Sequence, residues 1–137
     1  DLPGAGAAGG LGAGLVAFAG AELKNGAQLM LDLIGLESHL ADADLVLTTE
    51  GRLDSQIAYG KGPAAVAGLA RDYAVPCCLL AGSVRHASLP DLSALGITAT
   101  LSICPGPMDL ESALAETEAN LRQTTEHVVR LFAAGRP

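Results

Sequence analysis

Aromatic residues are nearly absent from this chain of 137 residues, which has no Trp and only two each of Phe and Tyr. Half of the residues are nonetheless apolar, so a buried core has to be built from Ala, Leu, Val and Ile. Seventeen glycines predict tight turns and close helix packing, because the apolar fraction is far too high for a disordered chain. The length fits one ordinary domain, or one domain with a piece of another.

Positive charge is also scarce, since eight Lys and Arg face 15 Asp and Glu, for a formal net charge of −7. A nucleic-acid surface needs a basic patch that neutralises phosphates, so we expect no nucleic-acid partner. The longest apolar stretch runs from Leu11 to Leu23 and is interrupted by three glycines and by Glu22. It is shorter than the roughly 20 apolar residues that cross a bilayer, so we expect no membrane partner either.

The cysteines Cys77, Cys78 and Cys104 are odd in number, and no pair has the two-residue spacing of a zinc or redox motif. Cys77 and Cys78 lie inside an apolar stretch, which is typical of buried thiols. With no basic segment and apolar core of a signal peptide at the start, this pattern predicts a reducing, cytoplasmic location. The chain begins with Asp1 in place of Met, which favours a piece of a longer protein.

Two patterns divide the chain. The first part is rich in glycine and alanine at residues 4–14 and then predicts helices that end near Gly20, Gly35 and residue 41. From Asp42 onward, short apolar strands alternate with helices. The expected elements are a strand at 44–49, a helix at 63–74, a strand at 77–81, a short helix before Gly96, a strand at 97–104 and a long helix after Asp109.

This alternation predicts an α/β fold with a small parallel sheet between helices and right-handed crossovers. Both faces of a parallel sheet have to be covered, so three strands are expected to be incomplete on their own.

Polar and charged residues cluster directly after the first predicted strand, where Glu50, Arg52, Asp54 and Gln56 fall within seven residues. Ligands of open parallel sheets bind outside the carboxyl ends of the strands, so this segment is the candidate site. Phosphoryl transfer needs cations that hold phosphate charge and carboxylates that hold Mg²⁺ or orient a hydroxyl group. A solvated loop in which Arg52 pairs with Asp54 or Glu50 is the structural alternative.

Each residue has a use in that chemistry. Arg52 can clamp a carboxylate or a phosphate through paired N–H donors. Either Asp54 or Glu50 can act as the general base or reach the metal, and Gln56 can hydrogen-bond a substrate hydroxyl group. Lys61 lies at a helix start, where a cation is unfavourable by about 0.3–1 kcal/mol unless an anion binds there.

Two further features of the sequence point to a ligand site less strongly. Ser83 follows Gly82 at the end of the second predicted strand, so its hydroxyl group can line the same ligand edge or cap a turn. The segment Gly4-x-Gly6-x-x-Gly9 matches the sequence motif of dinucleotide-binding folds, but no strand precedes it. A glycine-rich turn that leads into a packed helix is therefore the better interpretation.

Several blocks, taken together and in order, resemble the glycerate kinase family. They are residues 4–13 (Gly-Ala-Gly-Ala-Ala-Gly-Gly-Leu-Gly-Ala), 35–37 (Gly-Leu-Glu), 43–46 (Ala-Asp-Leu-Val), 50–56 (Glu-Gly-Arg-Leu-Asp-Ser-Gln), 60–63 (Gly-Lys-Gly-Pro) and 81–83 (Ala-Gly-Ser). The block at 50–56 with the nearby Gly-Lys is the most specific. Thr49 and Gly62 depart from the Gly and Ala that members usually carry there.

The resemblance implies transfer of a phosphoryl group from ATP to D-glycerate with Mg²⁺. It implies catalytic roles for Glu50, Arg52 and Asp54, with metal binding by Asp54 and Glu50. The substrate-binding residues it implies are Arg52, Gln56, Lys61 and Ser83.

It also implies an organisation in which residues 1–41 end an inserted glycine-rich domain and residues 42–137 return to a flavodoxin-like α/β domain. The family's N-terminal blocks are not in this chain, so the expected partner is the N-terminal part of the kinase. The alternative is a non-catalytic anion-binding module that associates with itself or another protein through its uncovered sheet edge.

Overall fold

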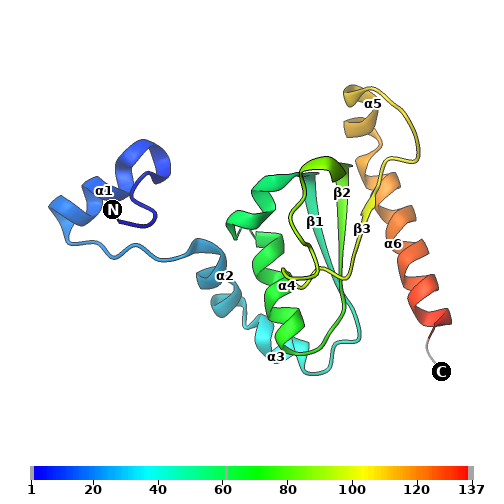
Figure 1. Cartoon of the computed structure of the whole chain (residues 1–137), viewed down its shortest axis with the longest axis horizontal. Coiled ribbons are helices and arrows are strands. Elements are labelled where there is room, and N and C mark those ends of the chain that lie inside the picture. Colours follow the sequence, from blue (N-terminus) through cyan, green and yellow to red (C-terminus); the bar gives the residue numbers. More distant parts are fainter. Residues whose placement is uncertain (1, 61, 136–137) are drawn as a thin grey trace. The chain divides into compact units, whose positions relative to one another are not determined.

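The computed structural model describes residues 2–60 and 62–135 (Figure 1). The chain divides into two compact units, one that ends at Leu36 and one that begins at Glu37. The second unit holds a three-stranded parallel sheet with helices, and the first is helical and rich in glycine. The predicted fold class is therefore confirmed, while the predicted domain boundary after residue 41 stays a prediction.

The first unit contains α1 (Ala7–Ala19) and α2 (Gly26–Ile34). Within α1 the backbone turns left-handed at Ala8, Gly9 and Gly10, where φ is 51°, 67° and 94°. This kink is the glycine-rich turn that the sequence predicts, because left-handed backbone favours glycine. Asn25 is the N-cap of α2, since its side chain accepts a hydrogen bond from the Gln28 amide at 3.1 Å.

The second unit follows the predicted alternation of strands and helices. Its elements in chain order are α3 (Leu36–Leu40, which starts on the last residue of the first unit), β1 (Val46–Leu53), the 3-10 helix η1 (Ser55–Tyr59), α4 (Gly62–Asp72), β2 (Cys77–Val84), the 3-10 helix η2 (His86–Ser88), β3 (Ala99–Ser102), α5 (Leu110–Ala115) and α6 (Thr117–Ala134). The sheet order is β1-β2-β3, and both pairings are parallel.

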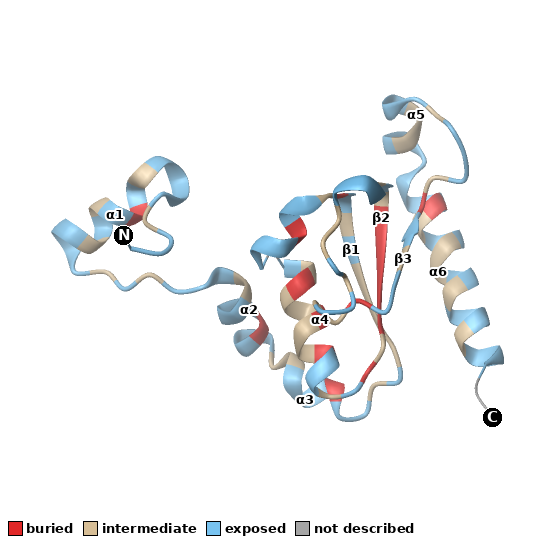
Figure 2. Cartoon of the chain, in the orientation of Figure 1, coloured by how far each residue is buried: buried red, intermediate tan, exposed pale blue. Residues whose placement is uncertain are grey.

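The central strand β2 carries the core. Its residues from Cys77 to Ala81 are all buried, because α4 and α6 lie on either side of the strands (Figures 1 and 2). On the α6 side, Cys78 and Leu80 form a cluster with Ile103, against which Leu121 and Val128 of α6 pack. Among the described residues the buried apolar side chains are Leu, Ile, Val, Ala and Cys, as the lack of aromatic residues predicts.

The strands run further than the sequence predicts. β1 continues through Arg52 to Leu53 and β2 through Ser83 to Val84, so residues expected in loops extend the parallel ladder. Gly82 permits this extension, because a Cβ atom there would lie only 2.7 Å from the carbonyl oxygen of Gly51. β3 is shorter than predicted, at four residues.

The predicted long C-terminal helix is two helices. Asp109 does cap its start, accepting from the Ser112 amide at 2.9 Å, but the backbone leaves helical geometry at Glu116, between α5 and α6. The expected apolar face is also only partly covered. Leu121 and Val128 pack on the sheet, whereas Leu110, Leu114 and Leu131 are 74%, 66% and 77% exposed.

Gly96 is a position where only glycine fits. Its φ is +87°, and an added Cβ atom would lie 2.3 Å from the carbonyl oxygen of Ala67 in α4. We expect Gly96→Ala to lower the free energy of unfolding by roughly 2–5 kcal/mol, from left-handed strain plus overpacking. Gly68→Ala is the control, because Gly68 lies in α4 with open space around it, and should stabilise by about 0.5–1 kcal/mol. Urea denaturation measures both, and equal midpoints for the two variants would contradict this packing.

Candidate functional site

The carboxyl end of β1 and the 3-10 helix η1 bring four of the predicted polar residues together. Glu50 and Arg52 lie on β1, Asp54 follows the strand directly, and Gln56 lies in η1. All four line one small pocket of about 250 Å³. Four of the six residues predicted as a site therefore share one pocket, at the edge of the sheet where the strand-end argument places it.

Two apolar anchors hold this pocket in place. Leu53 at the end of β1 is 0% exposed, and Ile57 in η1 is 3% exposed. Between them, Asp54 has extended backbone, and its Oδ1 accepts a hydrogen bond from the Gln56 amide at 3.0 Å. Asp54 thus acts as the N-cap of η1, which fixes its carboxylate beside the strand end.

The charges in the pocket are only loosely paired. The Nε atom of Arg52 lies 3.7 Å from Oδ2 of Asp54, and the Arg52 side chain is 52% exposed. Oε1 of Glu50 accepts a hydrogen bond from the Gly51 amide at 3.2 Å. Exposed ion pairs of this kind are worth about 0–1 kcal/mol, so the Arg52 guanidinium can exchange Asp54 for a bound anion at little cost.

Lys61 and Ser83 are the other two residues predicted as part of the site. Lys61 lies outside the described residues. Ser83 is on β2 directly beside Arg52 in the register of the two strands, but it lines a second, larger cavity. Its predicted place at the ligand edge of the sheet therefore fits the structure, although it does not share the pocket of Arg52.

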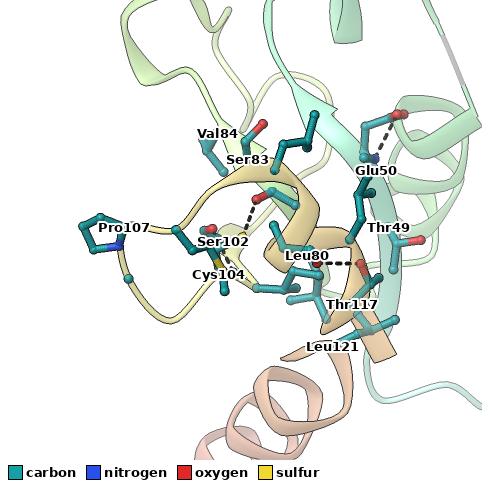
Figure 3. Close-up of a pocket in the computed structure, with 18 of the residues that line it drawn as sticks. Thr49, Glu50, Leu80, Ser83, Val84, Ser102, Cys104, Pro107, Thr117 and Leu121 are labelled. Carbon is teal, nitrogen blue, oxygen red and sulfur yellow. Dashed lines mark hydrogen bonds between the residues drawn. The ribbon is translucent and has the colours of Figure 1, made fainter. Parts of the chain in front are cut away.

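This larger cavity, of about 700 Å³, adjoins the small pocket, because Glu50 lines both. Figure 3 shows residues from all three strand ends and from the start of α6 around it, among them Ser83, Ser102 and Thr117. Ser102, Cys104 and Thr117 were not predicted from the sequence as residues near the site. The Pro105-Gly106-Pro107 turn after the third strand was the available signal, since it marks a loop at the same edge of the sheet.

The three cysteines differ in exposure. Burial, with a smaller contribution from the neighbouring Cys78, raises the pKa of Cys77 to about 11, and burial also raises the pKa of Cys78. Cys104 is half-buried at the cavity, where its thiol donates a hydrogen bond to the Gly82 carbonyl oxygen at 3.1 Å. Because Cys104 lines the cavity, its rate of alkylation can be used to detect a ligand bound there.

Across residues 2–60 and 62–135, no group of three or more His, Cys, Asp or Glu side chains is arranged to hold a metal ion. A metal at this edge would therefore need ligands beyond the carboxylates of the small pocket. No helix in the described part of the chain is long and apolar enough to span a membrane.

Comparison with known proteins identifies the family. A model of the glycerate kinase family matches residues 1–133. This chain belongs to the glycerate kinase family. The glycerate kinase of Bacillus cereus is 39% identical over 134 residues, which are 96% of this chain and 34% of that protein. The glycerate 2-kinase of Escherichia coli is 39% identical over 135 residues, 98% of this chain and 35% of that protein.

A solved structure agrees with this assignment. The crystal structure of a protein from Salmonella typhimurium LT2, provisionally assigned as glycerate kinase 2, has a TM-score of 0.71 and 44% identity. The match covers 98% of this chain and 34% of that one. The chain thus spans about a third of the length of its glycerate kinase relatives, which is consistent with the C-terminal portion of a member.

The thiols give a test of this geometry. At pH 8, about one in a thousand Cys77 side chains carries the reactive thiolate if the pKa is about 11, whereas Cys104 faces a cavity. We expect iodoacetamide to modify Cys104 at least tenfold faster than Cys77 or Cys78, as measured by peptide mass spectrometry. Equal rates at the three cysteines of the folded protein would contradict the described burial, and Cys104→Ser should remove the fast phase.

Proposed function

We propose that this chain is the C-terminal part of an ATP-dependent glycerate kinase, which transfers the γ-phosphoryl group of ATP to a hydroxyl group of D-glycerate to give a phosphoglycerate. The observation that carries the proposal is the pocket shared by Glu50, Arg52, Asp54 and Gln56 at the carboxyl edge of a parallel sheet. It sits in a chain of the family whose named members are glycerate kinases.

Arg52 is the residue that binds the anionic part of the substrates. Its guanidinium is exposed and loosely paired with Asp54, so it can turn to the glycerate carboxylate or to the transferred phosphate. Gln56 orients the acceptor hydroxyl group through its side-chain amide. Lys61, which follows this segment in the sequence, and Ser83 add donors for phosphate oxygens.

The carboxylates of Glu50 and Asp54 supply the general base and the metal ligand. One removes or holds the proton of the attacking hydroxyl group, and the other reaches the metal directly or through water. Two carboxylates in one pocket fit Mg²⁺, which proteins usually bind through one or two carboxylates together with substrate phosphates. When bound, Mg²⁺ neutralises charge on the phosphates, while Arg52 holds the acceptor in place.

The site is proposed to be shared with the remaining two thirds of the relatives' length. In this proposal residues 1–41 end an inserted domain, residues 42–137 belong to the flavodoxin-like domain, and the enzyme works in the cytoplasm. The division of the chain into two compact units supports such an organisation. The exposed Val129 and Leu131 on α6 also support it, because exposed apolar side chains on one helix favour contact with further protein.

Arg52 provides the sharpest test of the proposed site. In the full-length kinase that carries this sequence, we expect Arg52→Ala to lower kcat/KM for glycerate phosphorylation by at least about 100-fold, or about 2.7 kcal/mol. The free energy of unfolding should change by less than about 1 kcal/mol, because Arg52 makes only an exposed ion pair. A coupled assay for ADP and a denaturant titration measure the two quantities.

The matched control is Arg130→Ala. Arg130 also makes an exposed ion pair, at 2.6 Å to Glu126, but lies on α6 and lines neither pocket at the strand ends. It should leave both kcat/KM and stability unchanged. Near-normal turnover of Arg52→Ala, with the same turnover in Arg130→Ala, would overturn the role of Arg52.

A further inference from the structure

The larger cavity at the strand ends differs in chemistry from the charged pocket beside it. Its walls are mainly aliphatic, supplied by Leu80 and Ile103 of the core cluster, by Leu114 and Leu121 of the helices and by Met108 from the preceding loop. At about 700 Å³ it is nearly three times the volume of the charged pocket. Cavities of a few hundred to about 1,000 Å³ with such linings typically hold small organic ligands.

A few polar groups interrupt this apolar wall. Thr49 and Ser83 line the cavity, and their hydroxyl groups make no hydrogen bond to another described residue. Oγ of Ser102 accepts from the Cys104 amide at 3.2 Å, which leaves its own proton free for a ligand. The Thr117 hydroxyl group, by contrast, already donates to the Ala113 carbonyl oxygen at 2.9 Å. The cavity thus offers three hydroxyl groups to a ligand that is otherwise largely apolar.

Glycerate does not fit this description, because it carries a carboxylate and two hydroxyl groups and almost no apolar surface. A nucleoside does, since it combines a flat apolar ring system with sugar hydroxyl groups. The cavity also adjoins the charged pocket, because Glu50 lines both, and Ser83 on its wall lies beside Arg52 across the β1–β2 pairing. A triphosphate attached to a nucleoside in the cavity would therefore extend along the strand ends toward Arg52.

We propose that this cavity, closed on one side by α5 and the start of α6, holds the nucleoside of ATP (Figure 3). The inference rests on the proposed kinase function and adds the location of the phosphoryl donor. The donor and the acceptor then occupy neighbouring pockets of opposite character, one aliphatic and one charged. The charged pocket lies at the carboxyl end of β1 and the aliphatic cavity at the carboxyl end of β2, so both lie at the same edge of the sheet.

Ala113 of α5 is the position from which the cavity can be narrowed. It lines the cavity as a small residue, so Ala113→Phe places a ring in the proposed nucleoside space. In the full-length kinase we expect the KM for ATP to rise at least tenfold, while the KM for glycerate stays within twofold. Ala115→Phe is the matched control, because Ala115 is an exposed residue of the same helix that does not line the cavity, and both KM values should stay unchanged.

Alkylation of Cys104 gives a readout that does not depend on turnover. Because Cys104 lines the cavity, bound ATP should slow its reaction with iodoacetamide at least fivefold, and glycerate alone should not. In Ala113→Phe the same ATP concentration should no longer protect Cys104. Protection is measured by peptide mass spectrometry on the folded kinase.

The outcomes separate this inference from the proposed function. If the kinase phosphorylates glycerate but Ala113→Phe keeps a normal KM for ATP and ATP does not protect Cys104, the cavity assignment is wrong and the function stands. If glycerate is not phosphorylated but ATP protects Cys104, the function is wrong and the nucleotide pocket stands. If Ala113→Phe lowers the melting temperature of the nucleotide-free kinase and raises both KM values alike, the cavity is filled by protein, which also overturns the assignment.

Discussion

The parallel pairing of β1 with β2 beyond Glu50 is the constraint on which the rest of the site depends. The ladder continues to Arg52 beside Ser83 and Leu53 beside Val84 because Gly82 has no side chain to hold off the Gly51 backbone. This register places the charged pocket at the end of β1 and the aliphatic cavity at the end of β2. A side chain at position 82 would separate the strands where the two pockets meet.

The residues that stabilise the strand end differ from those proposed to act on the substrate. The strand end is held by buried Leu53 and Ile57, while the buried alanines of α4 and the aliphatic residues of β2 form the core. The charged side chains of the small pocket contribute little to that core, since Arg52 is half exposed and its partner lies 3.7 Å away. Arg52 is thus free to exchange partners, and its proposed role can be tested without unfolding the protein.

Much of this fold could be predicted from local sequence. The apolar stretches at 44–49 and 77–81 indicate buried parallel strands, and Asp109 and Gly35 mark helix ends that the structure confirms. The short helix predicted before Gly96 is instead a series of turns, although the Gly96 backbone is left-handed as expected of a cap. The extension of β1 through Glu50, Gly51 and Arg52 could not be predicted, because these residues have little strand preference and are held by pairing with a distant strand. The break between α5 and α6 at Glu116 could not be predicted either, because no Gly or Pro lies there. The 700 Å³ cavity arises from residues up to 72 positions apart, Thr49 to Leu121, so only the folded chain shows it.

The central claim is that these residues supply part of a glycerate kinase active site, and a chimera tests it most directly. This chain would replace the matching stretch of the Escherichia coli glycerate 2-kinase, to which it is 39% identical over 135 residues. The account predicts that the folded chimera forms phosphoglycerate from ATP and D-glycerate, which mass spectrometry detects. Its kcat/KM should be at least about 1% of the parent's, which corresponds to a loss of no more than about 2.7 kcal/mol in transition-state stabilisation. A chimera that folds with the parent's secondary structure and melting temperature but forms no phosphoglycerate would contradict the account.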